Sequence, residues 1–291
     1  MKQPPFFRFS SPAKLNLFLH VVGQREDGYH ELETLFQFLN YGDTLDIRIN
    51  NSGAIDLLTP MTGVATQDNL IYKAAKLLQD NTNNTLGADI KINKILPMGG
   101  GLGGGSSNAA TVLLALNLLW DCQLSTDELA KLGVSLGADV PIFIHGFSAF
   151  AQGIGEELTK ATPIEYWYLV SKPACHISTA AVFTHQDLPR GTPQLTSTKI
   201  NLEQCHNDCQ TLVIKHYPKV AKLLSWLLEY APSRMTGTGA CIFSHFNSET
   251  EALLIQSKLP PEVESFVAKG VNSSPVLVEL EALREKTKLF K

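Results

Sequence analysis

The sequence of 291 residues has no lysine or arginine run, no apolar run of membrane length and no CxxC pair. A formal net charge of -4 without a basic cluster argues against nucleic acid as a partner. The longest apolar stretch, Val112 to Trp120, is interrupted by Asn117 and is too short to cross a bilayer. Met1 to Pro5 begins the sequence without an apolar signal region, so we expect a cytoplasmic protein with no membrane partner.

Cysteine is also scarce, at five residues: Cys122, Cys175, Cys205, Cys209 and Cys241. Cys205, His206 and Cys209 could supply three metal ligands, but no second cluster accompanies them. Free thiols in a reducing compartment are the favoured interpretation. The ligands of any metal ion are unknown from the sequence.

Apolar residues make up 44% of the chain and charged residues 18%, which is typical of a globular protein. The length is comfortable for two lobes. We predict a boundary near Gly153–Glu156, which divides the chain into residues 1–154 and 155–291. Strand and helix patterns are mixed without regular alternation on both sides, which indicates an α+β fold.

Glycine is concentrated between Gly99 and Gly105, where six of seven residues are glycine and Ser106-Ser107-Asn108 follow. Ala88 to Asn93 alternates apolar and polar residues, which predicts a strand before this loop. Ala109 to Trp120 is almost wholly apolar and predicts a buried helix after it. A strand, a bare loop and a helix start direct several backbone N–H groups at one point, so we expect a phosphate-binding loop.

Other glycine-loop types fit less well. A Walker A loop is excluded because no lysine follows any of these glycines. A dinucleotide fingerprint matches formally at Gly99, Gly101 and Gly104. It needs a strand after the helix, whereas Ser125 and Glu128 form a capping box that predicts another helix. A flexible linker is disfavoured because a strand and an apolar helix flank the loop.

Three segments in chain order resemble the GHMP kinases: Ser11 to Leu17, Pro97 to Asn108 and Arg234 to Cys241. Asp27 to Leu32 and Gly137 to Phe143 are most similar to the branch of that family that acts on a cytidylyl alcohol in isoprenoid precursor biosynthesis. The resemblance extends from about residue 13 to about residue 243.

The resemblance implies a two-lobed α+β fold, with an amino-terminal lobe like ribosomal protein S5 and a ferredoxin-like carboxy-terminal lobe. Residues 1–154 are then expected to bind ATP and carry catalysis, and residues 155–291 to bind the substrate. It also implies ATP as co-substrate, Mg²⁺, a small cytidylyl substrate, and a monomer or homodimer. Two alternatives stay open: another GHMP kinase of homoserine or mevalonate type, and a non-catalytic nucleotide-binding module.

Lys14 and Asn16 are two residues apart on an apolar segment, so a strand would place both side chains on one face. The residues alone fit an active site and a water-facing strand equally well. Asp139 follows a helix predicted over residues 126–136, with Gly137 as a left-handed terminator, and alone would indicate a turn. The resemblance implies instead that Lys14 and Asp139 are catalytic, with Asp139 accepting the proton of the substrate hydroxyl.

The resemblance also implies which residues contact the two substrates. Ser106 and Ser107 are either helix N-caps or ligands of phosphate or magnesium. The expected ATP-binding residues are Pro97, Met98, Gly99, Gly100, Gly101, Leu102, Gly103, Gly104, Gly105, Ser106 and Ser107. The expected substrate-binding residues are Asn16, Tyr29, His30, Thr179 and Phe183, with Tyr29 and Phe183 stacking on the base. Core packing is the alternative for these two rings.

Overall fold

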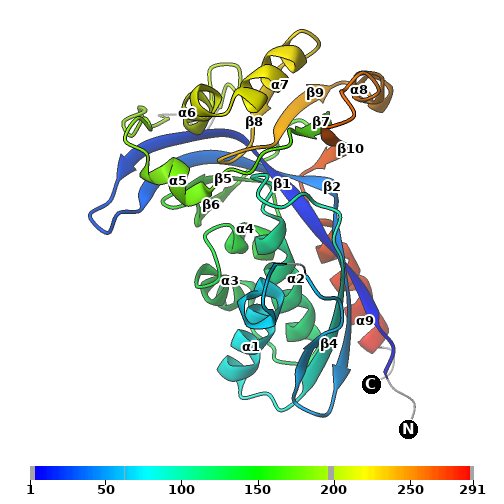
Figure 1. Ribbon diagram of the computed structural model, residues 1–291. Helices are drawn as coiled ribbons and strands as arrows, with labels where there is room; N and C mark the ends of the chain where they lie inside the picture. The colour runs from blue at the N-terminus through cyan, green and yellow to red at the C-terminus, as the bar shows by residue number, and fades with distance from the viewer. Residues whose placement is uncertain (1–3, 62, 196–199, 289–291) are drawn as a thin grey trace.

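The computed structural model describes residues 4–61, 63–195 and 200–288, and two long strands run through both of its lobes (Figure 1). β1 (Phe7–Gln24) and β2 (His30–Asn50) pair antiparallel along their length. Register shifts follow Pro12, Asn16 and Val21, where β-bulges bend the pair. Helices gather around both ends of this ribbon, which confirms the predicted two-lobed α+β architecture.

The other strands are β3 (Ile55–Leu57), β4 (Gly87–Asn93), β5 (Ala149–Gln152), β6 (Glu157–Lys160), β7 (Trp167–Lys172), β8 (Ser233–Met235), β9 (Ile242–Phe246) and β10 (Glu264–Val271). In the first lobe β2 pairs with β4 and β5, while β3 and β6 extend these pairs. In the second lobe the order is β10-β7-β9-β8, entirely antiparallel. A short pairing of β10 with β2 joins the two parts into one sheet.

The helices of the first lobe are α1 (Leu70–Thr82), α2 (Gly104–Leu119), α3 (Thr126–Val134), α4 (Val140–His145) and α9 (Pro275–Lys288). Those of the second lobe are α5 (Thr179–Thr184), α6 (Asp208–His216), α7 (Pro218–Leu228) and α8 (Glu249–Gln256). A 3₁₀ turn, η1, covers Thr66–Asp68. None of the described helices is long and apolar enough to span a bilayer.

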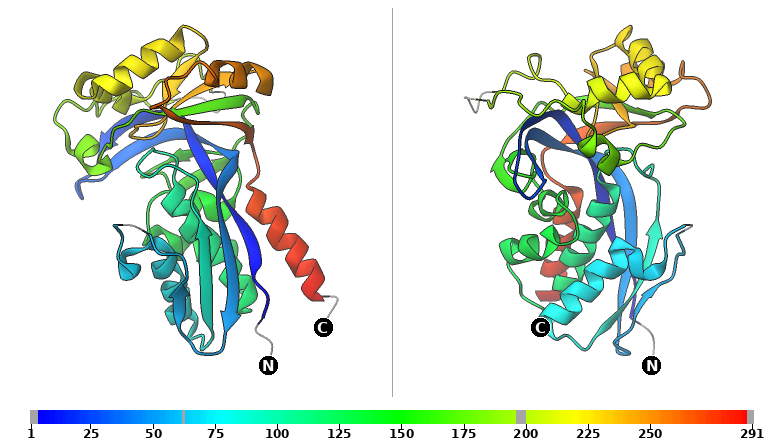
Figure 2. Two further views of the ribbon diagram at one scale, coloured as in Figure 1. Left: turned by 45° about the vertical axis from the view of Figure 1, so that its right-hand side comes forward. Right: turned by 60° about the vertical axis from the view of Figure 1, so that its left-hand side comes forward.

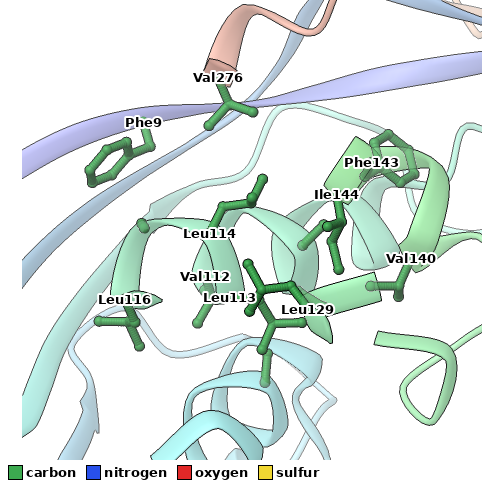
Figure 3. Close-up of a cluster of buried hydrophobic side chains, with 14 of the residues drawn as sticks. Phe9, Val112, Leu113, Leu114, Leu116, Leu129, Val140, Phe143, Ile144 and Val276 are labelled. Carbon is green, nitrogen blue, oxygen red and sulfur yellow. The ribbon is translucent and has the colours of Figure 1, made fainter. Parts of the chain in front are cut away.

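The core of the first lobe forms around α2, which is apolar on every side because its neighbours surround it. Figure 3 shows its leucines between β1, α3, α4 and the start of α9. The helix is buried from Ser107 to Asn117. The amino-terminal end, immediately after the glycines, is therefore a rigid element on which a binding site can be built.

The last helix returns to the first lobe, although its residues come at the end of the chain. Figure 2 shows α9 beside the first lobe. Its Val276 and Leu280 belong to the same buried cluster as Phe9 of β1, and Figure 3 shows Val276 and Phe9. Residues 153–156, where the sequence predicts the boundary, form the turn between β5 and β6. The assignment of ligands to residues 1–154 and 155–291 stays a prediction.

Local patterns predict most of the elements around the glycines. The strand expected over residues 88–93 is β4, and the buried helix is α2, which begins earlier than predicted, at Gly104. The capping box of Ser125 and Glu128 starts α3 as predicted. The left-handed conformation expected at Gly137 is wrong: α3 ends at Val134, and Gly137 is absent from the residues with positive φ. The chain turns directly into α4, with Val140 N–H donating to Gly137 O at 3.0 Å.

Candidate active site

Hydrogen bonds bring together the three segments that resemble the GHMP kinase motifs. Lys14 N–H of β1 donates to Leu102 O in the glycine loop at 3.0 Å. Cys241 N–H, after the loop that follows β8, donates to Gly100 O at 3.2 Å. Thr236 Oγ1 accepts from the N–H of Asn16 at 2.9 Å. Segments far apart in sequence thus meet at the point where the two lobes join.

The glycines are needed for this close approach. Gly101 has φ +77°, and a Cβ there would lie 2.3 Å from the carbonyl oxygen of Thr236. Gly103 has φ +70° and is the N-cap residue of α2, with no side chain capping the helix. The first N–H groups of a helix have no carbonyl partner within it, so those at the start of α2 can donate to a ligand.

The two serines after the glycines are not N-cap residues, because both lie inside the first turns of α2. Ser107 is buried and accepts a hydrogen bond from Ser11 Oγ at 2.9 Å. Ser106 lines the cavity that opens in front of the loop. Of the two, Ser106 is therefore the one that faces the cavity.

That cavity has a volume of about 590 Å³. It is lined by every residue from Pro97 to Ser106, by Lys14 and Asp139, and at another part of its wall by Thr179 and Phe183. The cavity is therefore lined both by the start of α2 and by residues of α5 in the other lobe. Ser107 is the one predicted phosphate-loop residue that does not line it.

Lys14 and Asp139 form an ion pair in the wall of the cavity, with Lys14 Nζ 3.1 Å from Asp139 Oδ2. Lys14 is 3% exposed, and its ammonium also donates to Asn16 Oδ1 at 2.6 Å and to Gly101 O at 3.2 Å. Asp139 is 35% exposed and stands at the start of α4, without capping that helix. A buried ammonium is stable only when acceptors surround it, and here they hold it against the carboxylate.

Asn16 lies beside Lys14, as the two-residue spacing predicts. Its amide accepts from Lys14 Nζ, and its Nδ2 donates to Thr34 Oγ1 at 2.9 Å. This chain of bonds fixes which way the amide faces. The water-facing alternative for this strand face is wrong, because both side chains are 3% exposed. The catalytic roles of Lys14 and Asp139 stay a prediction.

Only some of the expected substrate-binding residues line the cavity. Thr179 and Phe183 line the cavity, and Thr179 Oγ1 is 2.9 Å from Thr238 Oγ1. His30 is buried, with its ring centroid 5.3 Å from that of Phe183. Tyr29 is 59% exposed on the β1–β2 turn and does not line the cavity. Phe183 stacks on His30, and the stacking of Tyr29 and Phe183 on a base stays a prediction.

Lys94 is a cavity residue that the sequence analysis missed. Its ammonium donates to Asp43 Oδ2 and Leu96 O, each at 2.8 Å. The same carboxylate of Asp43 accepts from Ile95 N–H and Leu96 N–H, which fixes the segment leading into the glycines. The sequence signal that could have identified Lys94 is its place between the predicted strand and the glycine loop. Its pairing with Asp43, 51 residues away, could not be read from the pattern.

Another part of the cavity wall was also not predicted from the sequence. It combines apolar side chains with one amide and one exposed carboxylate, and its residues come from η1 and from the segments beside it: Met61, Val64, Asp68, Asn69 and Leu70. Their pattern before α1 predicts only a helix start, where Asn69 caps α1 by accepting from Ile71 N–H at 2.9 Å.

The cysteines that were considered as metal ligands lie in the protein interior. Cys205 and Cys209 are buried free thiols, and burial raises the pKa of Cys209 to about 12. Such thiols are poor metal ligands, which agrees with the free-thiol interpretation. In the cavity, Asp68 and Asp139 are the lining carboxylates among the residues that the structure covers.

Family models match two parts of the chain. "GHMP kinases N terminal domain" matches residues 69–147, and "GHMP kinases C terminal" matches residues 185–264. A protein of Colwellia psychrerythraea named 4-diphosphocytidyl-2-C-methyl-D-erythritol kinase is 64% identical over 92% of this chain and 91% of its own length. The chain belongs to the GHMP kinase family.

This GHMP kinase is also similar to two further proteins named as the Colwellia protein is and, in fold, to a mevalonate kinase. One from Aliivibrio fischeri is 57% identical over 97% of this chain and 98% of its own length. A crystal structure of 4-(cytidine 5'-diphospho)-2C-methyl-D-erythritol kinase superposes with a TM-score of 0.80 at 30% identity, covering 91% of this chain and 99% of its own. Methanococcus jannaschii mevalonate kinase, at 16% identity and a TM-score of 0.65, shares the fold over 93% of this chain and 99% of its own.

Proposed function

We propose that this GHMP kinase transfers the γ-phosphoryl group of ATP to the 2-hydroxyl of 4-diphosphocytidyl-2-C-methyl-D-erythritol, a step of isoprenoid precursor biosynthesis. The observation that carries the proposal is the Lys14–Asp139 pair, 3.1 Å apart between the glycine loop and the wall formed by Thr179 and Phe183. Relatives that bear this enzyme's name share 55% to 64% of their residues with this chain. We place the enzyme in the cytoplasm, as a monomer or homodimer.

The nucleotide is bound through its phosphates. The N–H groups at the start of α2 and the positive end of the helix face the cavity, and both attract the phosphate oxygens. The ammonium of Lys94 lies near this end: it would be 3.3 Å from a Cβ at Gly104. The apolar wall around Met61 and Leu70 is suited to a planar base, as ligand pockets usually combine such walls with few polar groups.

Asp139 serves as the general base. Its carboxylate accepts the proton of the substrate hydroxyl as the oxygen attacks the γ-phosphorus, and the bridging oxygen leaves with ADP. Lys14 orients Asp139 through their ion pair and places a positive charge beside the developing negative charge. Because Asn16 and Gly101 hold the ammonium, this arrangement exists before the substrate binds.

Mg²⁺ fits the polar side of this cavity. Ser106 Oγ faces the segment before Asp139, since it would lie 3.6 Å from a Cβ at Gly137. Ser106 would hold the ion together with phosphate oxygens and water, the ligands that Mg²⁺ commonly keeps in phosphoryl-transfer sites. When bound, the ion would neutralise charge on the phosphate oxygens.

The cytidylyl group would occupy the wall toward the second lobe. Phe183 offers an aromatic face and Thr179 a hydroxyl, while His30 lies behind Phe183. Tyr29 is on an exposed turn and would have to close over the base to stack on it. We therefore propose that residues on both sides of the predicted boundary bind the substrate, since Asn16, Tyr29 and His30 precede residue 155 whereas Thr179 and Phe183 follow it.

The decisive experiment compares ADP release with three alcohols: diphosphocytidyl-methylerythritol, mevalonate and homoserine. We expect turnover with the cytidylyl alcohol and background rates with the other two. Faster turnover of mevalonate or homoserine would favour another GHMP kinase activity. Nucleotide binding without turnover of any alcohol would indicate a non-catalytic module.

A further inference from the structure

Arg190 makes an unusual set of contacts in the irregular segment that follows α5. Its guanidinium uses all five N–H donors, which is the full capacity of an arginine. Nη2 donates to Phe183 O at 3.1 Å and to His185 O at 2.8 Å. Nη1 donates to Gln186 O at 3.4 Å and to Leu188 O at 3.2 Å. The side chain thereby fixes the whole turn after α5.

The fifth donor reaches a different element. Arg190 Nε donates to His30 Nε2, at the start of β2, at 3.0 Å. An arginine side chain stays protonated and can only donate, so Nε2 of His30 must be the acceptor. In the neutral ring, the proton is then on Nδ1. Burial lowers the pKa of His30, and the charge of Arg190 lowers it further, so the neutral ring is favoured.

The same guanidinium also sets the position of Phe183. It bonds to the carbonyl of that residue, and the ring of Phe183 lies 5.3 Å from the ring of His30 at an angle of 29°. Phe183 in turn lines the cavity beside the glycine loop. One side chain therefore determines both the tautomer of a buried histidine and the location of an aromatic face.

We propose that Arg190 is a positioning residue for recognition of the nucleobase: it holds His30 as the Nδ1–H tautomer and keeps Phe183 beside it. The ligand that we propose for this arrangement is a pyrimidine ring with acceptor atoms on one edge, such as O2 and N3 of cytosine. The identity of that ligand rests on the proposed function. Arg190 itself contacts neither the base nor the reacting groups.

The first test is independent of the reaction. In protein labelled with ¹⁵N at histidine, nuclear magnetic resonance distinguishes a protonated ring nitrogen from an unprotonated one. We expect His30 in the wild type to carry its proton on Nδ1, and Arg190→Gln to give a mixture of tautomers. An unchanged tautomer in R190Q would overturn the proposal. If R190Q does not fold, R190K serves, since one ammonium cannot reproduce the planar fork.

The second test separates binding from chemistry. We expect R190Q to raise the KM for the cytidylyl substrate about tenfold, with kcat and the KM for ATP within about twofold, and R190K to restore little of the loss. Arg25→Gln is the matched control, because Arg25 is a half-exposed arginine of the neighbouring β1–β2 turn, paired with Asp27. Equal changes in R25Q and R190Q, or equal effects on both substrates, would overturn the role in recognition.

The two tests fail separately. If the wild type does not phosphorylate the cytidylyl alcohol, the proposed function is wrong, yet the tautomer of His30 still reports on Arg190. Titration with cytidine monophosphate then replaces KM as the measure of recognition. A wild type and R190Q that bind this nucleotide equally well would overturn the proposal.

Discussion

The most constrained single residue in the site is Lys14. Its ammonium is almost fully buried and has Asn16, Gly101 and Asp139 as acceptors, of which only Asp139 carries a charge. Removing the carboxylate would leave this buried ammonium without its one charged partner, which destabilises the fold. Substitutions of Asp139 should therefore keep a polar side chain, so that a loss of activity is not a loss of folding.

Asp139→Asn is the variant that tests the general base. The amide keeps the shape of the carboxylate but cannot accept the hydroxyl proton, so we expect kcat to fall about a hundredfold or more. The KM for ATP should stay within a few-fold, because the glycine loop is unchanged. Asp127→Asn, at an exposed position of α3, is the control. Turnover near the wild-type rate in D139N would rule out the assignment.

Phe183→Ala tests the aromatic face. Stacking of a base on an aromatic side chain is worth about 1–3 kcal/mol, so we expect the KM for the cytidylyl substrate to rise about tenfold. The KM for ATP should change less than twofold, as Phe183 does not belong to the glycine loop. Steady-state kinetics with each substrate varied in turn provide the measurement. A similar rise in both KM values would count against base stacking.

Among the elements, the glycine loop shows what a sequence can and cannot reveal. The loop, its strand β4 and its helix α2 follow from periodicity, because each pattern is local. The end of α3 was mispredicted, because the helix ends at Val134 and the chain turns into α4 through a hydrogen bond from Val140 N–H to Gly137 O. The contacts of Arg190 with His30, 160 residues away in sequence, had no signal at all.

Gly101→Ala tests the contact between the glycine loop and the loop after β8. The new Cβ would lie 2.3 Å from the backbone oxygen of Thr236, at a φ of +77° that alanine rarely adopts. We expect the two loops to separate, with a KM for ATP at least tenfold higher and a lower Tm. Gly191→Ala is the matched control, because a Cβ there meets nothing within 4 Å. Unchanged ATP kinetics in G101A would show that the contact is dispensable.

For the molecule as a whole, packing does not follow the order of the chain. The carboxy-terminal helix α9 completes the core of the first lobe, while Leu19 and Val21 of β1 belong to the core of the second. A single boundary between residues 154 and 155 does not describe this packing, because the packing depends on contacts between residues far apart in the chain. The resemblance predicted the two lobes. Only the structure shows that α9 packs in the first lobe and that part of β1 packs in the second.

Three buried or half-buried histidines give the whole molecule a pH-dependent stability. Burial lowers the pKa of His20, His30 and His245 below the ordinary value of about 6.5. In the unfolded chain these rings take up protons as the pH falls through 6.5, whereas in the folded protein they resist protonation. The unfolded state then binds more protons, so the free energy of unfolding decreases as the pH falls.

We therefore expect the urea midpoint of unfolding to be constant above about pH 7 and to decrease between about pH 6.5 and 5. Each proton taken up only by the unfolded state lowers the free energy of unfolding by about 1.4 kcal/mol per pH unit. Asp46, Glu128 and Asp187 have lowered pKa values and lose their stabilising effect only at more acidic pH, so this window reports on the histidines. His245→Gln should make the decrease shallower. A midpoint that is equal at pH 7.5 and 5.5 would contradict the linkage.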